Sequence, residues 1–219
     1  GGIGTTISTA NANSFNNLTI AATGDVTTST VVDVHVANIF TVTGAFTVAA
    51  GHKLTLLTAT IGGSLTATAT TGSDAIISFE DAGVTNPSLD VVGTLVLTGT
   101  GTAERNAKIL GDNDSRIDVN ITGTFSGTNF TFEYPDEGGL HINGGPEPTI
   151  EAGTFDNPIN GNANCLLNLS DQANLPATIS NCIFNTTASG DVDELNGSRN
   201  VKSNGNTGVV TFLDYSGTL

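Results

Sequence analysis

Apolar and polar side chains alternate over residues 32–56, and this alternation constrains the fold more than any other feature of the chain. A period of two is typical of extended backbone that buries one face and leaves the other in water. Asn38, Gly44 and Gly51 interrupt the pattern without changing its parity. The stretch therefore predicts short strands that follow one another as consecutive sides of one coil, with Gly44 and Gly51 at corners. The residues predicted to be buried are Val32, Val34, Val36, Phe40, Val42, Phe46, Val48, Leu54 and Leu56.

The parity of the apolar positions changes after Thr58. Odd positions then carry the apolar residues, which are Ile61, Leu65, Ala67, Ala69, Ile77 and Phe79. Residues 89–97 and 117–125 keep to odd positions, and even positions return near Asn129. No segment shows the 3.6-residue apolar stripe of an amphipathic helix. The sequence predicts an all-β chain.

Composition limits the shape of the core. Hydrophobic residues make up 37% of the 219 residues, but aromatic residues only 5%, with no Trp and 27 Gly. Such a chain cannot fill a wide core with large side chains. It can fill a narrow one, in which Val, Leu, Ile and Ala stack in layers.

A weak repeat in the second half of the chain favours a particular all-β fold. The pieces GTFSG, GTFDN, NCIFN and VTFLD place Phe125, Phe155, Phe184 and Phe212 at spacings of 30, 29 and 28. A period of this size in a β-rich chain is typical of a solenoid, in which each coil adds one strand to each stacked sheet. We therefore expect a parallel β-helix.

The alternative fold is a β-sandwich, or two in tandem, with the same strands paired antiparallel. The absence of Trp and the scarcity of Asn-Gly hairpins disfavour it. Residues 1–17, which are rich in Gly, Thr and Asn, are expected to form an N-terminal arm or cap. Residues 18–219 are expected to form a single β-solenoid domain.

The run TVTGAFTVAAGHKLTL (residues 41–56) and the Phe-containing pieces together carry a resemblance. The chain resembles the β-helix and β-solenoid regions of large secreted microbial surface proteins, such as adhesins and autotransporter passengers. This resemblance implies an extracellular or cell-surface location and a structural or adhesive role. The open ends of a solenoid further predict self-association, end to end or by donation of the 1–17 segment as a strand, and surface glycans are the other expected partner.

The charge of the chain excludes some partners. Six Lys and Arg against 21 Asp and Glu give a formal charge of −15. Nucleic acid is excluded as a partner because phosphate binding needs a basic surface, and an anionic membrane is disfavoured for the same reason. No run of 18 or more apolar residues is present, so no membrane span is expected.

Two clusters of oxygen ligands predict calcium sites. One combines Asp112 and Asp114 with Asp118, and the other contains Asp191 and Asp193. Calcium takes about six to eight oxygen ligands, which such loops supply. Neither cluster completes a helix-loop-helix calcium motif. The alternative is that both are solvated turns whose Asx side chains bond to their own backbone.

Cys165 and Cys182 lie in similar Asn-Cys-apolar contexts, at a spacing of 17. One hypothesis is a disulfide formed in an oxidising compartment, which would contribute about 3 kcal/mol for a loop of this length. The other is a pair of buried free thiols, because Cys is often a small core residue. The sequence leaves both open.

Catalytic signals are weak. His35, His52 and His141 lie in ordinary contexts, with His35 expected to face outward and His52 to lie at a corner, and no GxSxG, HExxH or phosphate-binding loop occurs. Parallel β-helices nevertheless include polysaccharide lyases and hydrolases, so a polysaccharide-binding or polysaccharide-degrading β-helix is the alternative function. Only Tyr134 and Tyr215 are available as larger aromatic platforms for sugars. The sequence predicts a protein that is not an enzyme.

Overall fold

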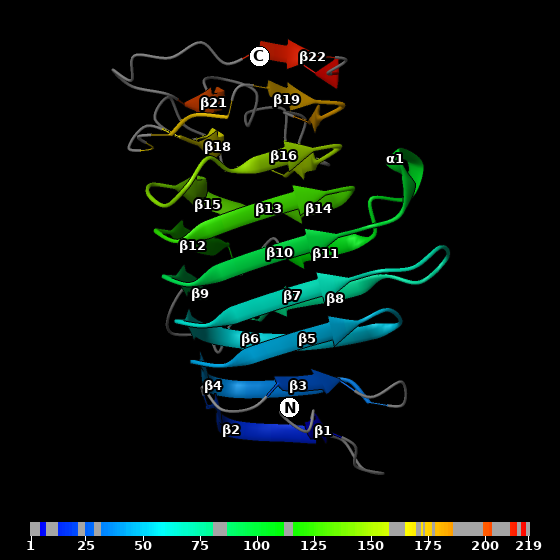
Figure 1. Cartoon of the computed structure of the whole chain (residues 1–219), viewed down its shortest axis with the longest axis vertical. Helices are drawn as coiled ribbons and strands as arrows, with labels where there is room; N and C mark the ends of the chain where they lie inside the picture. The colour runs from blue at the N-terminus through cyan, green and yellow to red at the C-terminus, as the bar shows by residue number, and fades with distance from the viewer. Residues whose placement is uncertain are drawn as a thin grey trace.

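The chain forms a parallel β-helix, as the sequence predicted. Figure 1 shows the strands stacked along the long axis, with the first coil at one end of the rod and the last at the other. The computed structural model describes residues 5–7, 13–21, 25–28, 32–80, 87–111, 116–157, 165–169, 172, 174–176, 178–185, 199–202, 211–213 and 216–217. All strands that pair between coils in these residues are parallel, so the antiparallel sandwich is excluded for them.

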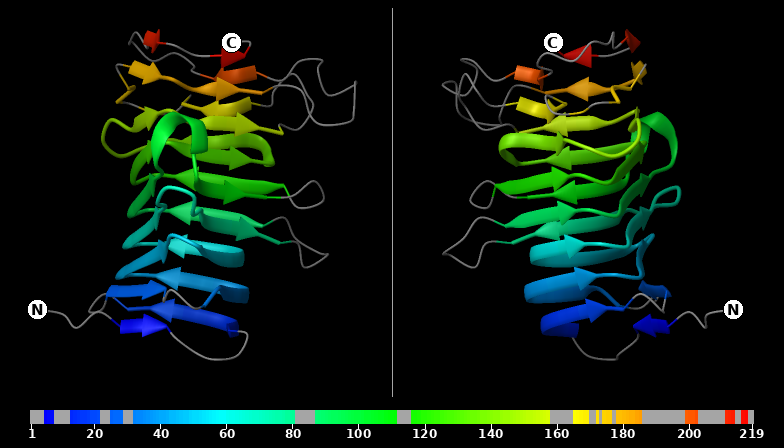
Figure 2. Two further views of the ribbon diagram at one scale, coloured as in Figure 1. Left: turned by 90° about the vertical axis from the view of Figure 1, so that its right-hand side faces the viewer. Right: turned by 60° about the vertical axis from the view of Figure 1, so that its left-hand side comes forward.

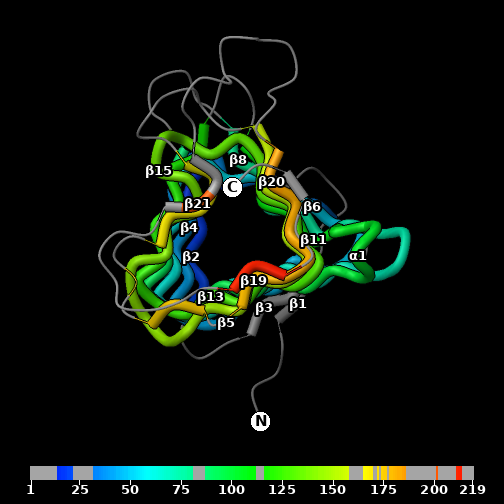
Figure 3. The backbone as a smooth tube through the Cα atoms, turned by 90° about the horizontal axis from the view of Figure 1, so that it is seen from above, coloured from blue at the N-terminus to red at the C-terminus, as the bar shows by residue number. Residues whose placement is uncertain are grey.

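The coil has a three-sided cross-section, which is visible down the axis in Figure 3. One side, called face 1, is a nine-stranded sheet. Its strands in order are β1 (Thr5–Ile7), β3 (Asp25–Thr28), β5 (Ala45–Ala49), β7 (Ser64–Thr68), β10 (Thr94–Thr98), β13 (Thr124–Thr128), β16 (Thr149–Glu151), β19 (Thr178–Ser180) and β22 (Thr211–Leu213).

A second, 14-stranded sheet supplies the other two sides. Face 2 consists of β8 (Ala75–Phe79), β11 (Ala107–Leu110), β14 (Phe130–Glu133), β17 (Thr154–Asp156), β20 (Ile183–Phe184) and β23 (Ser216–Gly217). Face 3 consists of β9 (Ser88–Val91), β12 (Ile117–Ile121), β15 (Pro135–Ile142), β18 (Cys165–Asn168) and β21 (Arg199–Lys202). Three longer strands, β2 (Asn13–Ile20), β4 (Val34–Val42) and β6 (His52–Ile61), run across both faces.

The bend between faces 2 and 3 explains the change of parity in the sequence. The first half of β6 pairs with β8, and its second half pairs with β9. At the bend, Leu56 and Ala59 are both buried, although their positions have opposite parity. The register of β6 against β4 also shifts there, between Val36 and Ile39. A strand that turns a corner must change which of its positions face the core.

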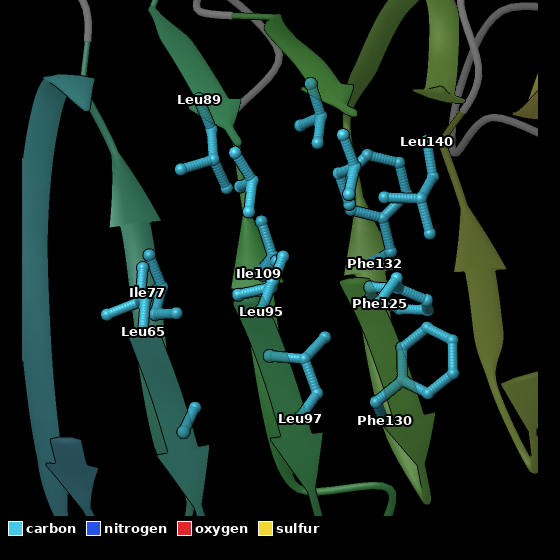
Figure 4. Close-up of a cluster of buried hydrophobic side chains, with 14 of the residues drawn as sticks. Leu65, Ile77, Leu89, Leu95, Leu97, Ile109, Phe125, Phe130, Phe132 and Leu140 are labelled. Atoms are coloured by element: carbon cyan, nitrogen blue, oxygen red, sulfur yellow. The ribbon is translucent and has the colours of Figure 1, made fainter. Parts of the chain in front are cut away.

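Columns of aligned apolar side chains fill the interior. All nine residues predicted to be buried in the 32–56 stretch are buried. Figure 4 shows Leu65, Leu95 and Phe125 of face 1 meeting Ile77, Ile109 and Phe132 of face 2. A narrow core of this kind needs few aromatic residues, in agreement with the composition.

The predicted Phe repeat is correct for one pair and wrong for the others. Phe155 aligns with Phe184, and the two rings stack with centroids 5.0 Å apart and an interplanar angle of 5°. Phe125, in contrast, aligns with Leu95 on face 1, and Phe212 aligns with Ile179. The near-equal spacing links residues on different faces because the coils differ in length.

The expected boundary after residue 17 falls inside a strand. Asn17 and Leu18 are consecutive residues of β2, which pairs along its length with β4. Phe15 and Leu18 both pack against the core. Residues 13–17 therefore belong to the coil, and the arm or cap that the sequence predicted does not extend over them.

The corner between face 3 and face 1 is built from two residues in four successive coils. The pairs are Thr43-Gly44, Gly62-Gly63, Val92-Gly93 and Thr122-Gly123. The backbone of each corner bonds to the coil before it, as in Thr94 N donating to Gly63 O at 2.8 Å. The glycines stack so closely that a Cβ on Gly93 would overlap the carbonyl oxygen of Gly63. Only glycine permits this approach.

Gly44 and Gly51 lie at corners, as predicted. Gly44 links β4 to β5, and Gly51 links β5 to β6 with a φ of +82°. The only helix in the described residues is the single-turn α1 (Gly101–Glu104), which projects from the corner between faces 1 and 2 (Figures 2 and 3). No helix in the described part of the chain is long and apolar enough to cross a bilayer.

Candidate functional site

Four successive strands in the middle of face 1 keep their geometry while the rest of the coil varies. The coil from Ala45 on β5 to its aligned partner Ser64 on β7 is short, whereas the coils from Ser64 to Thr94 and from Thr94 to Thr124 are much longer. Among the described residues, the added ones include the segments 69–74 and 99–106, which connect face 1 to face 2. The strands β5, β7, β10 and β13 all remain five residues long. They align without a register shift, whereas the other sheet contains three.

The outward side chains of these four strands form what we call the hydroxyl face. They lie in three ranks that run along the rod. The first rank is Ala45, Ser64, Thr94 and Thr124; the second is Thr47, Thr66, Val96 and Ser126; the third is Ala49, Thr68, Thr98 and Thr128. Nine of the twelve residues are Ser or Thr, and the other three are Ala or Val.

The β-sheet fixes the spacing of these hydroxyl groups in two directions. Residues of one rank are about 4.8 Å apart, and ranks are about 6.6 Å apart along each strand. The inward residues between the ranks are buried, as Phe46, Leu65 and Leu95 illustrate. Thr is branched at Cβ and therefore stiff about χ1, so its hydroxyl and methyl groups hold a repeated orientation. The result is a flat, pre-ordered lattice of hydroxyl groups.

The hydroxyl face carries no charged residue, although the chain has 6 Lys and Arg and 21 Asp and Glu. The described charges of the coils concerned lie elsewhere. Lys53 and Lys108 are on face 2 strands, and Asp90 and Asp118 are on face 3 strands. The hydroxyl face therefore differs from the other two sides of these coils in chemistry as well as in regularity, whereas face 1 beyond it carries Asp25 on β3 and Glu151 on β16.

A polar depression of about 370 Å³ lies on the opposite side of the coil, where β2, β4 and β6 cross face 2. Ser14 Oγ lies 3.2 Å from His35 Nδ1, and His35 Nε2 lies 3.9 Å from Glu80 Oε2. Lys53 Nζ lies 3.7 Å from the other oxygen of Glu80. His35 faces outward, as predicted, whereas His52, expected at a corner, is the buried first residue of β6, directly after the corner at Gly51.

The depression does not have the geometry of nucleophilic catalysis. A distance of 3.9 Å between His35 and Glu80 is too long for a hydrogen bond, so the carboxylate does not fix the ring. The side chains of His35 and Glu80 are 44% and 53% exposed, and water competes for both. This arrangement suits weak binding of a small polar group.

The structure describes only one of the five predicted calcium ligands. Asp118 lies on β12, where burial raises the pKa of its carboxyl, Asp90 raises it further, and His141 lowers it. Asp112, Asp114, Asp191 and Asp193 lie outside the described residues. Among the described residues, no group of three or more His, Cys, Asp and Glu is placed to hold a metal. Calcium binding at either cluster stays a prediction.

Asp136, near Asp118 on face 3, is expected to make stability depend on pH. Burial raises the pKa of Asp136 to about 6, Asp118 adds to the rise, and the Gly138 N–H opposes it. Because the folded-state pKa lies above the unfolded one, this group stabilises the fold at low pH and loses that effect as pH rises through about 6. Asp136→Asn keeps the acceptor for Gly138 N (2.8 Å) and removes the charge.

At pH 7.5 the Asp136→Asn variant should be more stable than the wild type by about 1 kcal/mol, since solvent screening reduces the effect of a half-exposed group. At pH 4 the two proteins should be nearly equal. Urea unfolding at both pH values measures this difference, and Glu137→Gln, which removes an exposed charge from the next residue, should change stability less. A variant less stable than the wild type at pH 7.5 would contradict the expectation.

The two cysteines are buried and form no disulfide, so the disulfide hypothesis is wrong for this structure. Cys165 begins β18 on face 3, and Cys182 precedes β20 at the corner between faces 1 and 2. One full coil in this region leads from Leu140 to Leu167, or from Thr178 to Thr211. The chain between the two cysteines covers little more than half of such a coil, which places the two sulfur atoms on opposite sides.

Both thiols should be protected in the folded protein. Burial raises the pKa of Cys182 to about 11, so its unreactive neutral form dominates at pH 8. We expect alkylation of neither cysteine under native conditions and of both in denaturant without reductant, as measured by intact mass. Cys182→Ser should reduce the count by one. Absence of alkylation in denaturant would show that the cysteines are oxidised.

A polar cluster that the sequence did not reveal stabilises the corner beneath α1. Asn106, 1% exposed, donates to Thr70 O (2.8 Å) and Ser73 O (3.2 Å) and accepts from Thr100 N (2.8 Å). The neighbouring Arg105 is 8% exposed and has a φ of +43°. Its guanidinium donates to Thr154 Oγ1 at 2.9 Å and to Asn181 O at 2.6 Å, in later coils.

Sequence reasoning also missed the hydroxyl face, although a signal for it exists. The pieces VTGAF, IGGSL, VVGTL and ITGTF each place an apolar residue two positions before the corner glycine and a small residue directly after it. They begin at Val42, Ile61, Val91 and Ile121, so the first spacing is much shorter than the two that follow. A search for one fixed period overlooks them because the inserted segments change the coil length.

Comparison of the chain with protein-family models, with curated proteins and with solved structures finds no match.

Proposed function

We propose that the chain is a structural and adhesive rod of an extracellular or cell-surface protein, which attaches to its partner through face 1. The observation that carries this proposal is the constancy of the hydroxyl face. Its four strands keep their length and register although the coil after Ser64 is much longer than the coil before it. Packing of the core alone does not require outward residues of one chemical kind. A contact surface does.

The rest of the molecule supports a role in binding. In the polar depression near His35, no hydrogen bond from Glu80 orients the imidazole as in a catalytic triad. The resemblance to solenoid regions of secreted surface proteins agrees with a rod that positions a contact surface. The strong negative charge of the chain, none of it on the hydroxyl face, keeps such rods soluble and apart in solution.

Retention on solid surfaces tests this function. The purified protein is applied to microcrystalline cellulose, chitin, calcite and ice, together with Thr66→Lys on the hydroxyl face and Thr41→Lys on face 3. Both are half-buried threonines on strands of adjacent coils, and both substitutions change the net charge equally. We expect at least one surface to retain the wild type and Thr41→Lys but to lose Thr66→Lys. No retention on any surface, or equal loss in both variants, would refute the proposal.

End-to-end assembly is a second candidate function, favoured by the open ends of the sheets. In the described residues, β1 and β22 end face 1, and β21 and β23 end the second sheet at the C-terminal end of the rod. Each pairs on one side only, and a second copy stacked on the axis would continue every sheet in the same parallel sense. Electron microscopy distinguishes filaments from single rods. Because the subunits repel one another, filaments should lengthen as salt increases.

A further inference from the structure

We propose that the hydroxyl face binds ice, and that a crystal of water is the partner to which this rod attaches. The inference rests on the proposed adhesive function of face 1 and names its partner. It follows from three properties of the twelve outward residues: two-dimensional regularity, lack of charge, and chemical type.

The regularity of the face indicates a partner that is itself a flat lattice. Ranks about 6.6 Å apart and coils about 4.8 Å apart repeat the same hydroxyl positions in two directions. A single glycan chain repeats in one direction, and a folded protein surface repeats in none. Neither explains why four strands of equal length align without a shift while the remainder of each coil varies.

The lack of charge excludes ionic lattices. A mineral, an anionic membrane or a polyelectrolyte would be recognised by charged side chains, and the face has none. Crystalline polysaccharide is neutral, but sugar rings pack their C–H faces on aromatic side chains. The aromatic residues of these strands, Phe46 and Phe125, point inward and are at most 1% exposed. Ice is the neutral lattice that remains.

The side chains match the chemistry of ice. A Ser or Thr hydroxyl both donates and accepts hydrogen bonds, as a water molecule does. The Thr methyl groups between the hydroxyls order the adjacent water. Because Thr is stiff about χ1, little side-chain entropy is lost when the face meets the crystal. Nine weak contacts then form together on one rigid surface, and their effects combine.

A second copy of the chain fits this face less well. Four strands about 4.8 Å apart, with five residues of about 3.3 Å each, cover roughly 300 Å². A stable protein interface buries about 800 Å² on each partner and is enriched in aromatic residues. The hydroxyl face has neither this area nor outward-facing aromatic residues. It also does not need a large area on ice, because a growing crystal overgrows and traps any rod that stays attached.

The test is uptake into slowly growing ice, with the shape of single ice crystals as a second measurement. We expect the wild type to enter the ice and to produce faceted crystals. Thr66→Lys, which places a long hydrated side chain in the second rank, should lower the bound fraction about tenfold, whereas Thr41→Lys should match the wild type. Thr98→Lys and Thr60→Lys repeat the comparison at more exposed threonines, where substitution disturbs packing less.

Two results would overturn the inference: exclusion of the wild type from ice with unshaped crystals, or equal loss in the face 1 and face 3 variants. Microcrystalline cellulose separates this failure from failure of the proposed function. A protein that is excluded from ice but held on cellulose through Thr66 is adhesive with a different partner. A protein held on none of the surfaces would refute both the ice-binding inference and the proposed adhesive function.

Discussion

Replacing Gly93 by alanine is expected to lower the unfolding free energy by about 3 kcal/mol or more, because the new methyl group has no room. Its Cβ would overlap the carbonyl oxygen of Gly63 and lie 2.5 Å from that of Gly62. Both atoms are backbone, and the hydrogen bond from Thr94 N to Gly63 O (2.8 Å) fixes the spacing of the coils there. The strain falls at the corner that leads into β10, along the edge of the hydroxyl face.

Gly62→Ala is the matched control. Gly62 lies in an equivalent corner, and a Cβ there meets only Val42 O, at the ordinary distance of 3.6 Å. The neighbouring coils already place Thr43 and Val92 at this corner position. Urea midpoints should therefore separate the two alanine variants, with Gly62→Ala within about 0.5 kcal/mol of the wild type. Equal effects would mean that the glycine stack does not set the coil spacing.

Replacing Asn106 by alanine is expected to cost about 2–3 kcal/mol, because three part-buried backbone groups each lose a hydrogen bond, although Thr70 O and Ser73 O keep those from Ser73 N and Thr70 N. The side-chain amide of Asn106 donates to Thr70 O and Ser73 O and accepts from Thr100 N. It thereby connects the hairpin at residues 70–73 to the turn that leads into α1. Without it these segments lose their common anchor. Residues 100–104 should then become a preferred site of proteolysis, while far-ultraviolet circular dichroism still reports the β-helix.

Asn38→Ala provides the comparison for Asn106, since Asn38 is an exposed asparagine on β4. Its removal should change the urea midpoint by an amount within about 0.5 kcal/mol. Asn106→Asp should be at least as harmful as alanine, because it keeps the acceptor but places a carboxylate beside Thr70 O and Glu104. A stable Asn106→Asp variant would show that the amide hydrogens contribute little.

The sequence revealed the fold because two-residue alternation depends only on local geometry. The buried residues from Val32 to Leu56 and the corners at Gly44 and Gly51 followed from side-chain direction along extended backbone. The alignment of residues in one coil with residues in the next could not be inferred from side-chain direction. Phe125 and Phe155 look like successive repeats, yet the coil from Ser126 to its aligned partner Thr149 is shorter than their spacing of 30, so Phe155 lies past face 1, on face 2.

The candidate site was harder to predict because its residues have no individual reactivity. A calcium cluster or a catalytic triad is recognisable from residue types, whereas Thr66 or Thr98 alone resembles any exposed threonine of a β-sheet. Only the alignment of four coils turns them into a surface. The cysteines illustrate the same limit. Cys165 and Cys182 have similar local sequence contexts, but the length of the coil determines whether their sulfur atoms can approach each other.

Arg105 has a consequence for how the rod responds to pulling forces. In a solenoid each coil contacts only its neighbours, so tension applied between the ends peels coils away one at a time. The guanidinium of Arg105 bonds to Thr154 and to Asn181, and so ties the coil that contains β11 to those that contain β17 and β20. Arg105 thereby links coils that are not neighbours, in the C-terminal half of the rod. In a tether that must hold against drag, these coils should resist peeling more than coils that are joined only to their neighbours.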